Sequence, residues 1–567
     1  MRHPGPEPDA DAAPRLTLTT LPWDVIISVL AFVRPLDIYS IRKTCKILHD
    51  ATRQHVVWIN ALRGVCYDNN LYLEFFSPEE MPLLHLEHAA TMPSRFIRRV
   101  KDTIAFDNAY RARLTPPTPA LEDETPPEES ENNKLPYLAP LFIRELEIPA
   151  VPGPPVWNLE DAVSELRLAP GGRYLAMNHY WDMQIWDLGL STSEKPRLIA
   201  HRTFPGNGDF VIYGIWVKPD GRGLQIQTNF LCMEPAQNDL AIWEIYPSDP
   251  NPVLTQVASL VRGPMLTYEC RGGSRIAISE ESRVGVWDPT LNTLVTWDVP
   301  VDMVTMLVIQ TRAICLYKDS IAVYEVPHIT PRPHRAFVEE SRKLTPIWTT
   351  LLPYSVDDYF LPASWPYTAE HGSPRGDLYF GLTEASPPRN YVYRVPARPL
   401  PVSEAAAIDL VAIVDVEGPV PERLDNFLQR PVRMCEGHLA LMSEPESREE
   451  VRLQILEEPH PGRAFLNALM ADDDESGDLL PGRMPGAWIP RPMTPLPAGP
   501  SPSPLPQTVP EEYKDKAMRA PTWSVALWRG NNDITDFEFD GASGRACAIT
   551  EDYDVLVLDY LEAPKLA

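Results

Sequence analysis

The sequence predicts a multidomain chain in which a small all-α helical unit precedes an all-β propeller of about seven blades. Three features indicate this fold class. They are helix-spaced apolar residues within 16–62, a recurring strand–turn–strand pattern from residue 160 onward, and two proline-rich acidic segments. At 567 residues the chain is also too long for one ordinary hydrophobic core.

The composition excludes several classes of protein. The chain has 63 prolines, about one residue in nine against a usual ~5%, so parts of it cannot be regular structure. Its seven cysteines are scattered and never form a Cys-x-x-Cys pair, which argues against a disulfide framework or a zinc site and indicates a reducing compartment. Residues 1–14 lack the apolar run of a signal peptide, and no stretch approaches the roughly 18 apolar residues that span a bilayer. We therefore expect a soluble, cytoplasmic and/or nuclear protein with no membrane partner.

The net charge of −27 is unevenly distributed. Residues 1–113 hold 14 Lys and Arg against 13 Asp and Glu, a net charge of +1, so residues 114–567 carry −28. Such an acidic body is a poor partner for nucleic acid, because phosphate binding needs a basic surface. Two interpretations of the charge stay open: general solubility, or a preference for basic partners.

Residues 16–62 contain three short helical patterns. Pro22 suits the first turn of the first helix, where its missing N–H costs nothing, and Asp24 faces the positive end of that helix. Pro35 separates the first helix from the second. The apolar positions of the three patterns are Val25, Ile26, Val29, Leu30 and Val33, then Ile38, Ile41, Cys45 and Leu48, and then Val56, Val57, Trp58 and Leu62. A unit this small has little core of its own and usually needs a partner to complete it.

These residues stand in a specific order. The chain reads Leu21-Pro22-x-Asp24-Val25-Ile26, then Pro35-Leu36-Asp37-Ile38, then Cys45-Lys46 and a late Trp58. The order and spacing resemble the F-box family. The resemblance implies docking to the Skp-type adaptor of a cullin–RING ubiquitin ligase, through Leu21, Pro22, Val25, Ile26, Val29 and Leu36.

A second interpretation of the same residues is that they only pack the three helices against each other. We favour this packing role for Val29 and Ile41. Docking is favoured for Leu21 and Pro22, because both lie at the exposed start of the unit.

The expected domain boundaries follow composition. Residues 114–138 and 471–515 combine acidic runs with clustered prolines, and neither segment can bury enough apolar surface to offset the entropy of ordering. Residues 63–113 keep helical character and hold a basic cluster that we place on a solvated face, Arg95, Arg98, Arg99 and Lys101. The expected segments are a disordered N-terminus at 1–15, the F-box at 16–62, a helical spacer at 63–113, a linker at 114–138, and the propeller at 139–567 with a disordered loop at 471–515.

The β-rich body repeats one local pattern. A short apolar strand meets a Gly-containing turn, then an Arg, then a second apolar strand, and a further strand ends in an aromatic–acid pair. The Arg positions are 173, 222, 275 and 545, and the pairs are Trp186-Asp187, Trp243-Glu244, Trp287-Asp288 and Leu558-Asp559. Weaker copies occur at 305–326, 346–395 and 434–456. About seven such units are a propeller number.

The repeats resemble the WD-repeat family of propellers, although the resemblance is partial. The Gly-His pair expected near each repeat start is missing, so the number of blades stays open. For the Trp–Asp pairs we expect a structural role, in which Trp fills the space between blades and Asp closes a turn.

The repeated arginines are the candidates for target binding. Because Arg173, Arg222, Arg275 and Arg545 hold equivalent places in four repeats, we expect them on one annulus, where guanidinium groups would suit a phosphorylated target. The alternative is that each caps its own turn or pairs with a nearby acid. A basic segment meeting an acidic rim is a further alternative, since the acidic body repels phosphate.

The sequence gives no sign of catalysis. Nucleophile-elbow, zinc-protease, phosphate-loop and dinucleotide motifs do not occur, and no His/Cys group has metal-ligand spacing. We therefore expect no enzyme activity and no cofactor. The resemblances imply the substrate-recognition subunit of a Skp–cullin–F-box ubiquitin ligase, with the propeller binding an unknown target protein. The alternative is an F-box and propeller scaffold without a role in ubiquitination.

Overall fold

The structure is a computed structural model of the chain. It describes residues 17–69, 71, 76–114, 135–149, 163–179, 181–204, 208–218, 222–233, 236–262, 266–272, 275–280, 282–309, 311–327, 337–352, 356, 358–360, 378–385, 388–395, 409–415, 433–435, 438–443, 450–456, 522–529 and 534–562. Most of the predicted linker at 114–138 and the whole predicted loop at 471–515 lie outside these residues, as does the predicted tail at 1–15.

The N-terminal part is helical, as predicted. A short 3-10 turn at Leu18–Thr20 precedes the helices α1 (Trp23–Leu30), α2 (Pro35–Arg42), α3 (Lys46–Thr52), α4 (His55–Asp68) and α5 (Leu83–Leu114). Pro35 stands at the first position of α2, where its fixed φ suits the helix. Buried side chains from α1 to α4 form the small core of this unit: Ile26, Leu30, Ile38, Leu48, Val57, Trp58 and Leu62.

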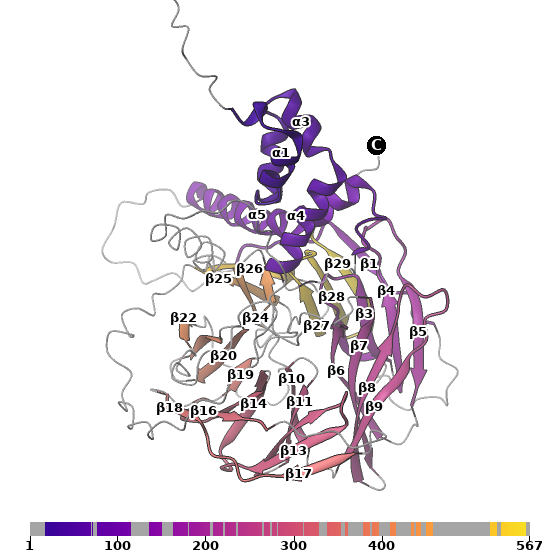
Figure 1. Cartoon of the computed structure of the whole chain (residues 1–567), viewed down its shortest axis with the longest axis vertical. Helices are drawn as coiled ribbons and strands as arrows, with labels where there is room; N and C mark the ends of the chain where they lie inside the picture. The colour runs from indigo at the N-terminus through magenta and orange to yellow at the C-terminus, as the bar shows by residue number, and fades with distance from the viewer. Residues whose placement is uncertain are drawn as a thin grey trace, which may run out of the picture.

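The remainder is all-β. In the part of the chain that the structure describes, the strands form seven sheets that follow one another around a ring (Figure 1). From inner to outer strand, the first sheet is β2 (Val163–Leu168), β3 (Tyr174–His179), β4 (Asp182–Asp187) and β5 (Arg197–Thr203), and the second is β6 (Gly208–Val217), β7 (Leu224–Met233), β8 (Ala236–Ile245) and β9 (Thr255–Arg262). The third is β10 (Leu266–Gly272), β11 (Arg275–Glu280), β12 (Arg283–Asp288), β13 (Thr293–Asp298) and β17 (Val338–Ser341), and the fourth is β14 (Met303–Ile309), β15 (Arg312–Tyr317), β16 (Ser320–Glu325) and β18 (Trp348–Leu351). The fifth is β19 (Asp358–Phe360), β20 (Leu378–Ala385), β21 (Pro388–Val395) and β22 (Asp409–Asp415), the sixth is β23 (Arg433–Cys435), β24 (His438–Ser443), β25 (Glu450–Leu456) and β26 (Thr522–Arg529), and the last is β27 (Ile534–Asp540), β28 (Arg545–Thr550), β29 (Val555–Asp559) and β1 (Phe142–Glu145). The predicted fold class, a helical unit followed by an all-β propeller, is confirmed.

The first and last sheets pack against neighbouring sheets on both sides, which explains the residue pattern of their strands. The middle strands β3 and β28 are buried along their whole length, because both of their faces meet another sheet. The outer strands β5 and β9 are mostly exposed. The inner strand β2 of the first sheet lies beside β27 of the last sheet, so the ring is closed.

Closure depends on a segment from the start of the propeller. Strand β1 pairs antiparallel with β29, from Phe142 opposite Asp559 to Glu145 opposite Leu556. The outermost strand of the last sheet therefore comes from the N-terminal side of the propeller. Residues 135–138, which the sequence analysis assigned to the linker, run along β26: the Leu138 N–H donates to the Ala526 carbonyl at 2.9 Å.

The predicted turn chemistry is confirmed at two hairpins. Gly172, between β2 and β3, has a φ of +68°, and Gly544, between β27 and β28, has a φ of +62°. These left-handed values favour glycine. A Cβ at position 172 would also lie 2.0 Å from the Ser543 hydroxyl oxygen, so the close approach of the first and last sheets independently requires glycine here.

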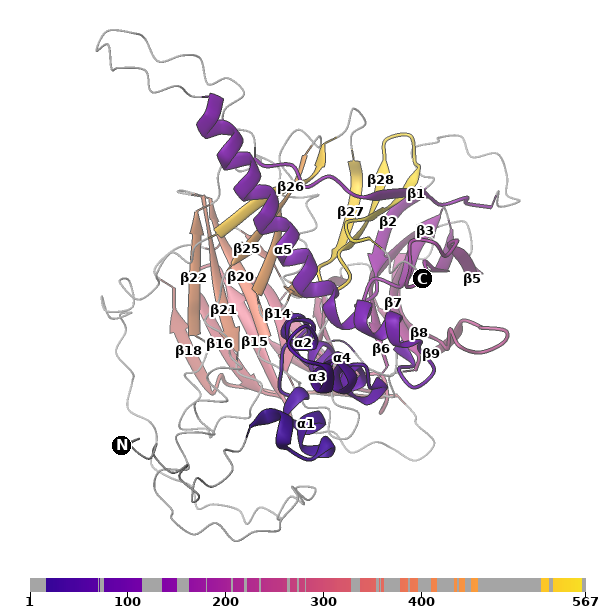
Figure 2. The same cartoon turned by 90° about the horizontal axis from the view of Figure 1, so that it is seen from above.

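The helical unit is joined to the ring through α5, which crosses the rim beside β26 (Figure 2). Phe96 of α5 packs against Phe539 and Tyr560, with ring centroids 5.2 and 6.2 Å away. Arg99 donates to the carbonyls of Tyr560 and Ala139, and Arg95 donates to the Glu562 carbonyl at 3.2 Å. The expectation that the basic cluster of α5 lies on a solvated face is therefore wrong for Arg95 and Arg99.

A charged contact fixes α5 to the helices before it. Arg42 of α2 forms an ion pair with Glu87 of α5 at 2.6 Å, and the Tyr39 hydroxyl donates to the same carboxylate at 3.0 Å. Burial, together with the adjacent Arg95, lowers the pKa of His88 to about 3, so this imidazole is neutral and its Nδ1 accepts from Arg95 at 2.9 Å. The helices and the propeller share one hydrophobic core.

Two buried threonines offer a matched test of polar contacts inside the ring. Thr228 accepts the indole N–H of Trp243 at 2.9 Å, whereas the equally buried Thr296 hydroxyl has no hydrogen-bond partner among the described residues. Thr228→Val should lower the free energy of unfolding by about 1–3 kcal/mol, because it leaves a buried N–H unpaired. Thr296→Val should be nearly neutral. Urea unfolding followed by fluorescence measures both, and equal losses in the two variants would contradict this assignment.

Candidate functional site

An exposed apolar surface lies on α1 and on the residues directly before and after it. We call the exposed residues Pro22, Trp23, Val25, Val29 and Phe32 the α1 surface. Val25 is 37% exposed, Val29 41% and Phe32 88%, which is unusual for side chains of this kind within one short segment. Several exposed apolar side chains in one short segment indicate a protein-binding site.

The local sequence explains how α1 presents this surface. Pro22, Val25, Val29 and Phe32 are spaced by three, four and three residues, so they follow one side of a helix. Ile26 and Leu30 follow the adjacent side and face the core, with exposures of 1% and 2%. The single apolar stripe expected from the sequence is therefore two stripes with different roles.

The predicted adaptor-binding residues divide accordingly. Pro22, Val25 and Val29 lie on the α1 surface, while Leu21 and Leu36 are half-buried at its border. Ile26 is buried in the helical core and cannot contact a partner in this conformation. Val29 is exposed, although the sequence favoured a packing role for it. Sequence reasoning missed Trp23 and Phe32. The helical spacing of three residues from Val29 could have revealed Phe32, whereas the spacing from Val25 and Val29 gives no such signal for Trp23.

Three of the four repeated arginines pair with acids inside their own sheets. Each of the three stands at, or directly before, the start of one middle strand, and the acid that ends the next strand lies opposite it. The ion pairs are Arg173–Asp187 at 3.0 Å, Arg275–Asp288 at 3.5 Å and Arg545–Asp559 at 2.6 Å. A fourth pair of the same kind, which the sequence analysis did not single out, is Arg312–Glu325 at 3.7 Å.

This geometry agrees with the alternative given for the arginines, that each pairs with a nearby acid, and target binding through them stays a prediction. Arg545 is buried, and Arg173 and Arg275 hold their guanidinium groups against carboxylates of their own sheets. In the second sheet Lys218 pairs with Glu244 at 2.5 Å, and the predicted Arg222 is exposed. The acid of each aromatic–acid pair is thus the partner of the repeat cation, rather than a turn-closing group alone.

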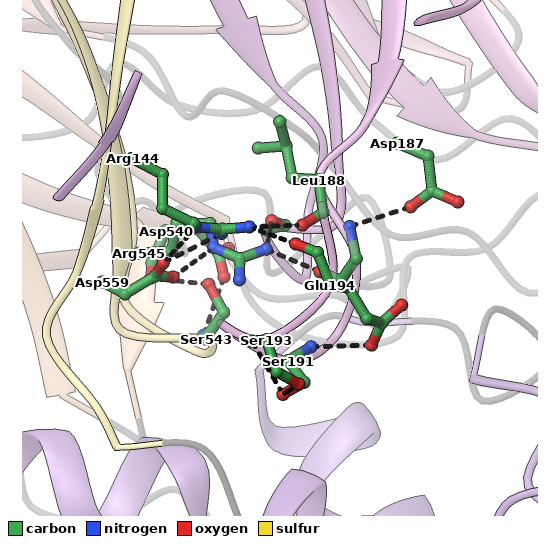
Figure 3. Close-up of polar contacts among 12 residues, drawn as sticks. Arg144, Asp187, Leu188, Ser191, Ser193, Glu194, Asp540, Ser543, Arg545 and Asp559 are labelled. Atoms are coloured by element: carbon green, nitrogen blue, oxygen red, sulfur yellow. Dashed lines mark hydrogen bonds and ion pairs between the residues drawn. The ribbon is translucent and has the colours of Figure 1, made fainter. Parts of the chain in front are cut away.

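The last sheet holds a more extended version of this pair (Figure 3). Asp559 accepts from Nε of Arg545 on β28 at 2.6 Å and from Nε of Arg144 on β1 at 3.0 Å. Arg545 also donates to the carbonyls of Gly172 and Gly189, at 2.8 and 2.7 Å. Arg144 and Arg545 together therefore connect the last sheet to the loops of the first.

Arg144 extends this network to the loop after β4. It donates to the carbonyls of Leu188 and Glu194, at 3.0 and 2.9 Å. Burial lowers the pKa of the Arg144 guanidinium, and the Asp559 carboxylate opposes that shift. We call Arg144, Arg545 and Asp559 the ring clasp, because they join β1, the C-terminal strands and the first sheet.

Within the described residues, no group of three His, Cys, Asp or Glu side chains could hold a metal ion. No helix of the described part is long and apolar enough to cross a membrane. The polar clusters described above join helices, strands and loops of this chain to each other.

Comparison with known proteins identifies a family match for the N-terminal helices. Residues 18–60 match the family model described as the F-box domain. No curated protein matches the sequence. Similar solved structures include the C-terminal WD40 domain of Sif2, a chain of the mitotic checkpoint complex, and the WD40 domain of SCAP from fission yeast.

These likenesses are distant. The sequence identities are 10%, 8% and 9%, and the TM-scores are 0.34, 0.36 and 0.34, in the order given. The matches cover 70%, 78% and 70% of this chain and 97%, 100% and 84% of the other chains. At such scores the propeller assignment depends on the sheet topology of this chain itself.

The matched segment contains α1, α2, α3 and the α1 surface, and the sheets follow it as a closed ring. Residues 18–60 of this chain therefore match the F-box domain, and α5 joins this segment to a ring of β-sheets with the architecture of a β-propeller.

Proposed function

We propose that this chain is the substrate-recognition adaptor of a Skp–cullin–F-box ubiquitin ligase. The α1 surface docks the Skp-type adaptor, and the propeller binds the target protein. The observation that carries the proposal is the exposure of Trp23, Val25, Val29 and Phe32 on the F-box domain. A partner that covers these side chains removes their apolar surface from water. This burial stabilises the complex by about 25 cal/mol for each Å² of apolar surface.

The contacts that join the F-box domain to the propeller agree with this role. The Arg42–Glu87 ion pair fixes α2 to α5, and Phe96 fixes α5 to the last sheet. A target bound to the propeller is thereby held at a constrained distance from the ligase core. The chain then contributes proximity and orientation, while the conjugating enzyme of the ligase supplies the chemistry.

The test places charge on the α1 surface. In the double variant Val25→Asp and Val29→Asp, the affinity for a purified Skp-type adaptor should fall about a thousandfold, because burying uncompensated carboxylates costs several kcal/mol. Isothermal titration calorimetry with the full chain measures the loss. Val301→Asp, at an 84% exposed valine of the propeller, is the matched control and should bind with unchanged affinity.

Unchanged adaptor affinity in the double variant, with the far-UV circular dichroism of the wild type, would exclude the α1 surface as the docking site. A second candidate function, an F-box scaffold without a ligase role, makes a different prediction. The chain would then bind the adaptor, but a reconstituted ligase that contains it would not ubiquitinate any protein that the propeller captures.

A further inference from the structure

Strand β9 is the outermost strand of its sheet, and its sequence is that of an edge strand able to pair with a further strand. Its sequence, Thr-Gln-Val-Ala-Ser-Leu-Val-Arg, has no charged residue before Arg262. Val257 and Val261 point outward and are 47% and 54% exposed, while Leu260 faces the core. Native sheets usually protect long apolar edges with charges, prolines or a covering segment.

The chain itself covers two comparable outer strands. Strand β17 pairs in parallel with β13, from Thr293 opposite Val338 to Thr296 opposite Ser341. Residues 136–138 run in parallel along β26, where Tyr137 is bridged to Ala526. Strands β13 and β26, like β9, have no charge in their interior. In the described part of the chain, β9 has no such covering strand.

The surroundings of β9 select the charge of its partner. The loop before β9 holds the exposed Asp249, and no Lys or Arg occurs from residue 247 to residue 261. At the other end Arg262 is paired with both Glu280 and Glu339, at 3.7 and 3.1 Å, so that cluster carries a net negative charge. Residues 114–567 together carry −28. A second copy of this chain would be repelled, whereas a basic segment would be attracted.

We infer that the outer edge of β9 binds an extended segment of the recruited target, with β-branched or other apolar residues at alternate positions and Lys or Arg at its ends. The added strand would pair with the free edge of β9 and place its apolar side chains beside Val257 and Val261. This inference rests on the proposed function, since it names the target's chemistry. Figure 1 shows β9 on the part of the ring far from α1, so the target and the Skp-type adaptor would not compete.

The probe is a labelled peptide of alternating valine and threonine with two lysines at each end, roughly as long as β9. Fluorescence anisotropy with the full chain should show binding that weakens as salt rises. A peptide with a central proline, which cannot pair along its length, should not bind. A peptide with glutamates at its ends should bind at least about tenfold more weakly.

The matched variants keep β propensity and remove only apolar contact. Val257→Thr with Val261→Thr should weaken the lysine-flanked peptide about tenfold, because two methyl groups are exchanged for hydroxyls. Val301→Thr should leave the affinity unchanged. Every one of these variants should bind the Skp-type adaptor through the α1 surface with wild-type affinity. Failure of the β9 inference can therefore be distinguished from failure of the proposed function.

Equal binding of the proline peptide, or no effect of the paired threonine variant, would overturn the inference. So would sedimentation that shows a wild-type dimer and a monomer for the paired variant, since β9 would then be an interface between two copies of this chain.

Discussion

Asp559→Ala is expected to destabilise the propeller by about 3–5 kcal/mol, because it leaves the buried Arg545 and the half-buried Arg144 without their carboxylate. Arg545 is 5% exposed and Asp559 3%, so water cannot replace the lost contact. Arg144 and Arg545 would then repel each other inside the ring clasp, and both join β1 or the last sheet to loops of the first sheet. The midpoint of urea unfolding of the full chain measures the loss.

Asp298→Ala is the matched control for the ring clasp. Asp298 also pairs with an arginine, Arg283, at 3.5 Å, but the Asp298 side chain is 83% exposed. Exposed ion pairs contribute at most about 1 kcal/mol, so this variant should unfold almost as the wild type does. Similar midpoint shifts for the two variants would show that burial of the ring clasp has no special effect on stability.

Phe96→Ala is expected to weaken the attachment of the helices to the propeller by about 3–5 kcal/mol. The Phe96 ring is fully buried between α5 and the last sheet, where it packs against Phe539 and Tyr560. Hydrogen exchange of the α5 amides in the full chain should accelerate, because the helix can then open without unfolding the ring.

Phe106→Ala, on the same helix, is the control for this effect. Phe106 is 75% exposed, and its loss should change stability by no more than about 0.5 kcal/mol. Unchanged exchange of α5 in the Phe96 variant would mean that the backbone bonds of Arg95 and Arg99 are sufficient to hold the helix in place.

Features that depend on neighbouring residues were predictable from the sequence. The helices α1 and α2 are set by local apolar spacing and by Pro35 at a first helical turn. Hairpin turns such as the one at Gly172 are set by the need for a left-handed φ. The F-box order from Leu21 to Trp58 is similarly local, and the matched family model covers residues 18–60.

The sequence only partly predicted which apolar residues of a helix are buried and which are exposed. Val25 and Ile26 are neighbours of similar size in one amphipathic stripe, yet one is exposed and the other is buried. The difference arises from how α1 lies against the other helices, and residue spacing alone does not report that contact. The sequence therefore predicted helix α1 but not which of its apolar residues are exposed and which are buried.

The roles of the charged residues and the ring closure were decided by tertiary structure. Arg545 and Asp559 are 14 residues apart and meet through the register of β28 and β29. Arg173 and Asp187, also 14 residues apart, meet through the corresponding register of β3 and β4 in the first sheet. Arg144 and Asp559 are separated by 415 residues, and they meet because β1 pairs with β29. Strand β17 likewise pairs with β13, although β14, β15 and β16 of the next sheet come between them in the sequence. Local sequence determines which segments become strands and turns, whereas long-range pairing depends on the total apolar surface that the closed ring removes from water.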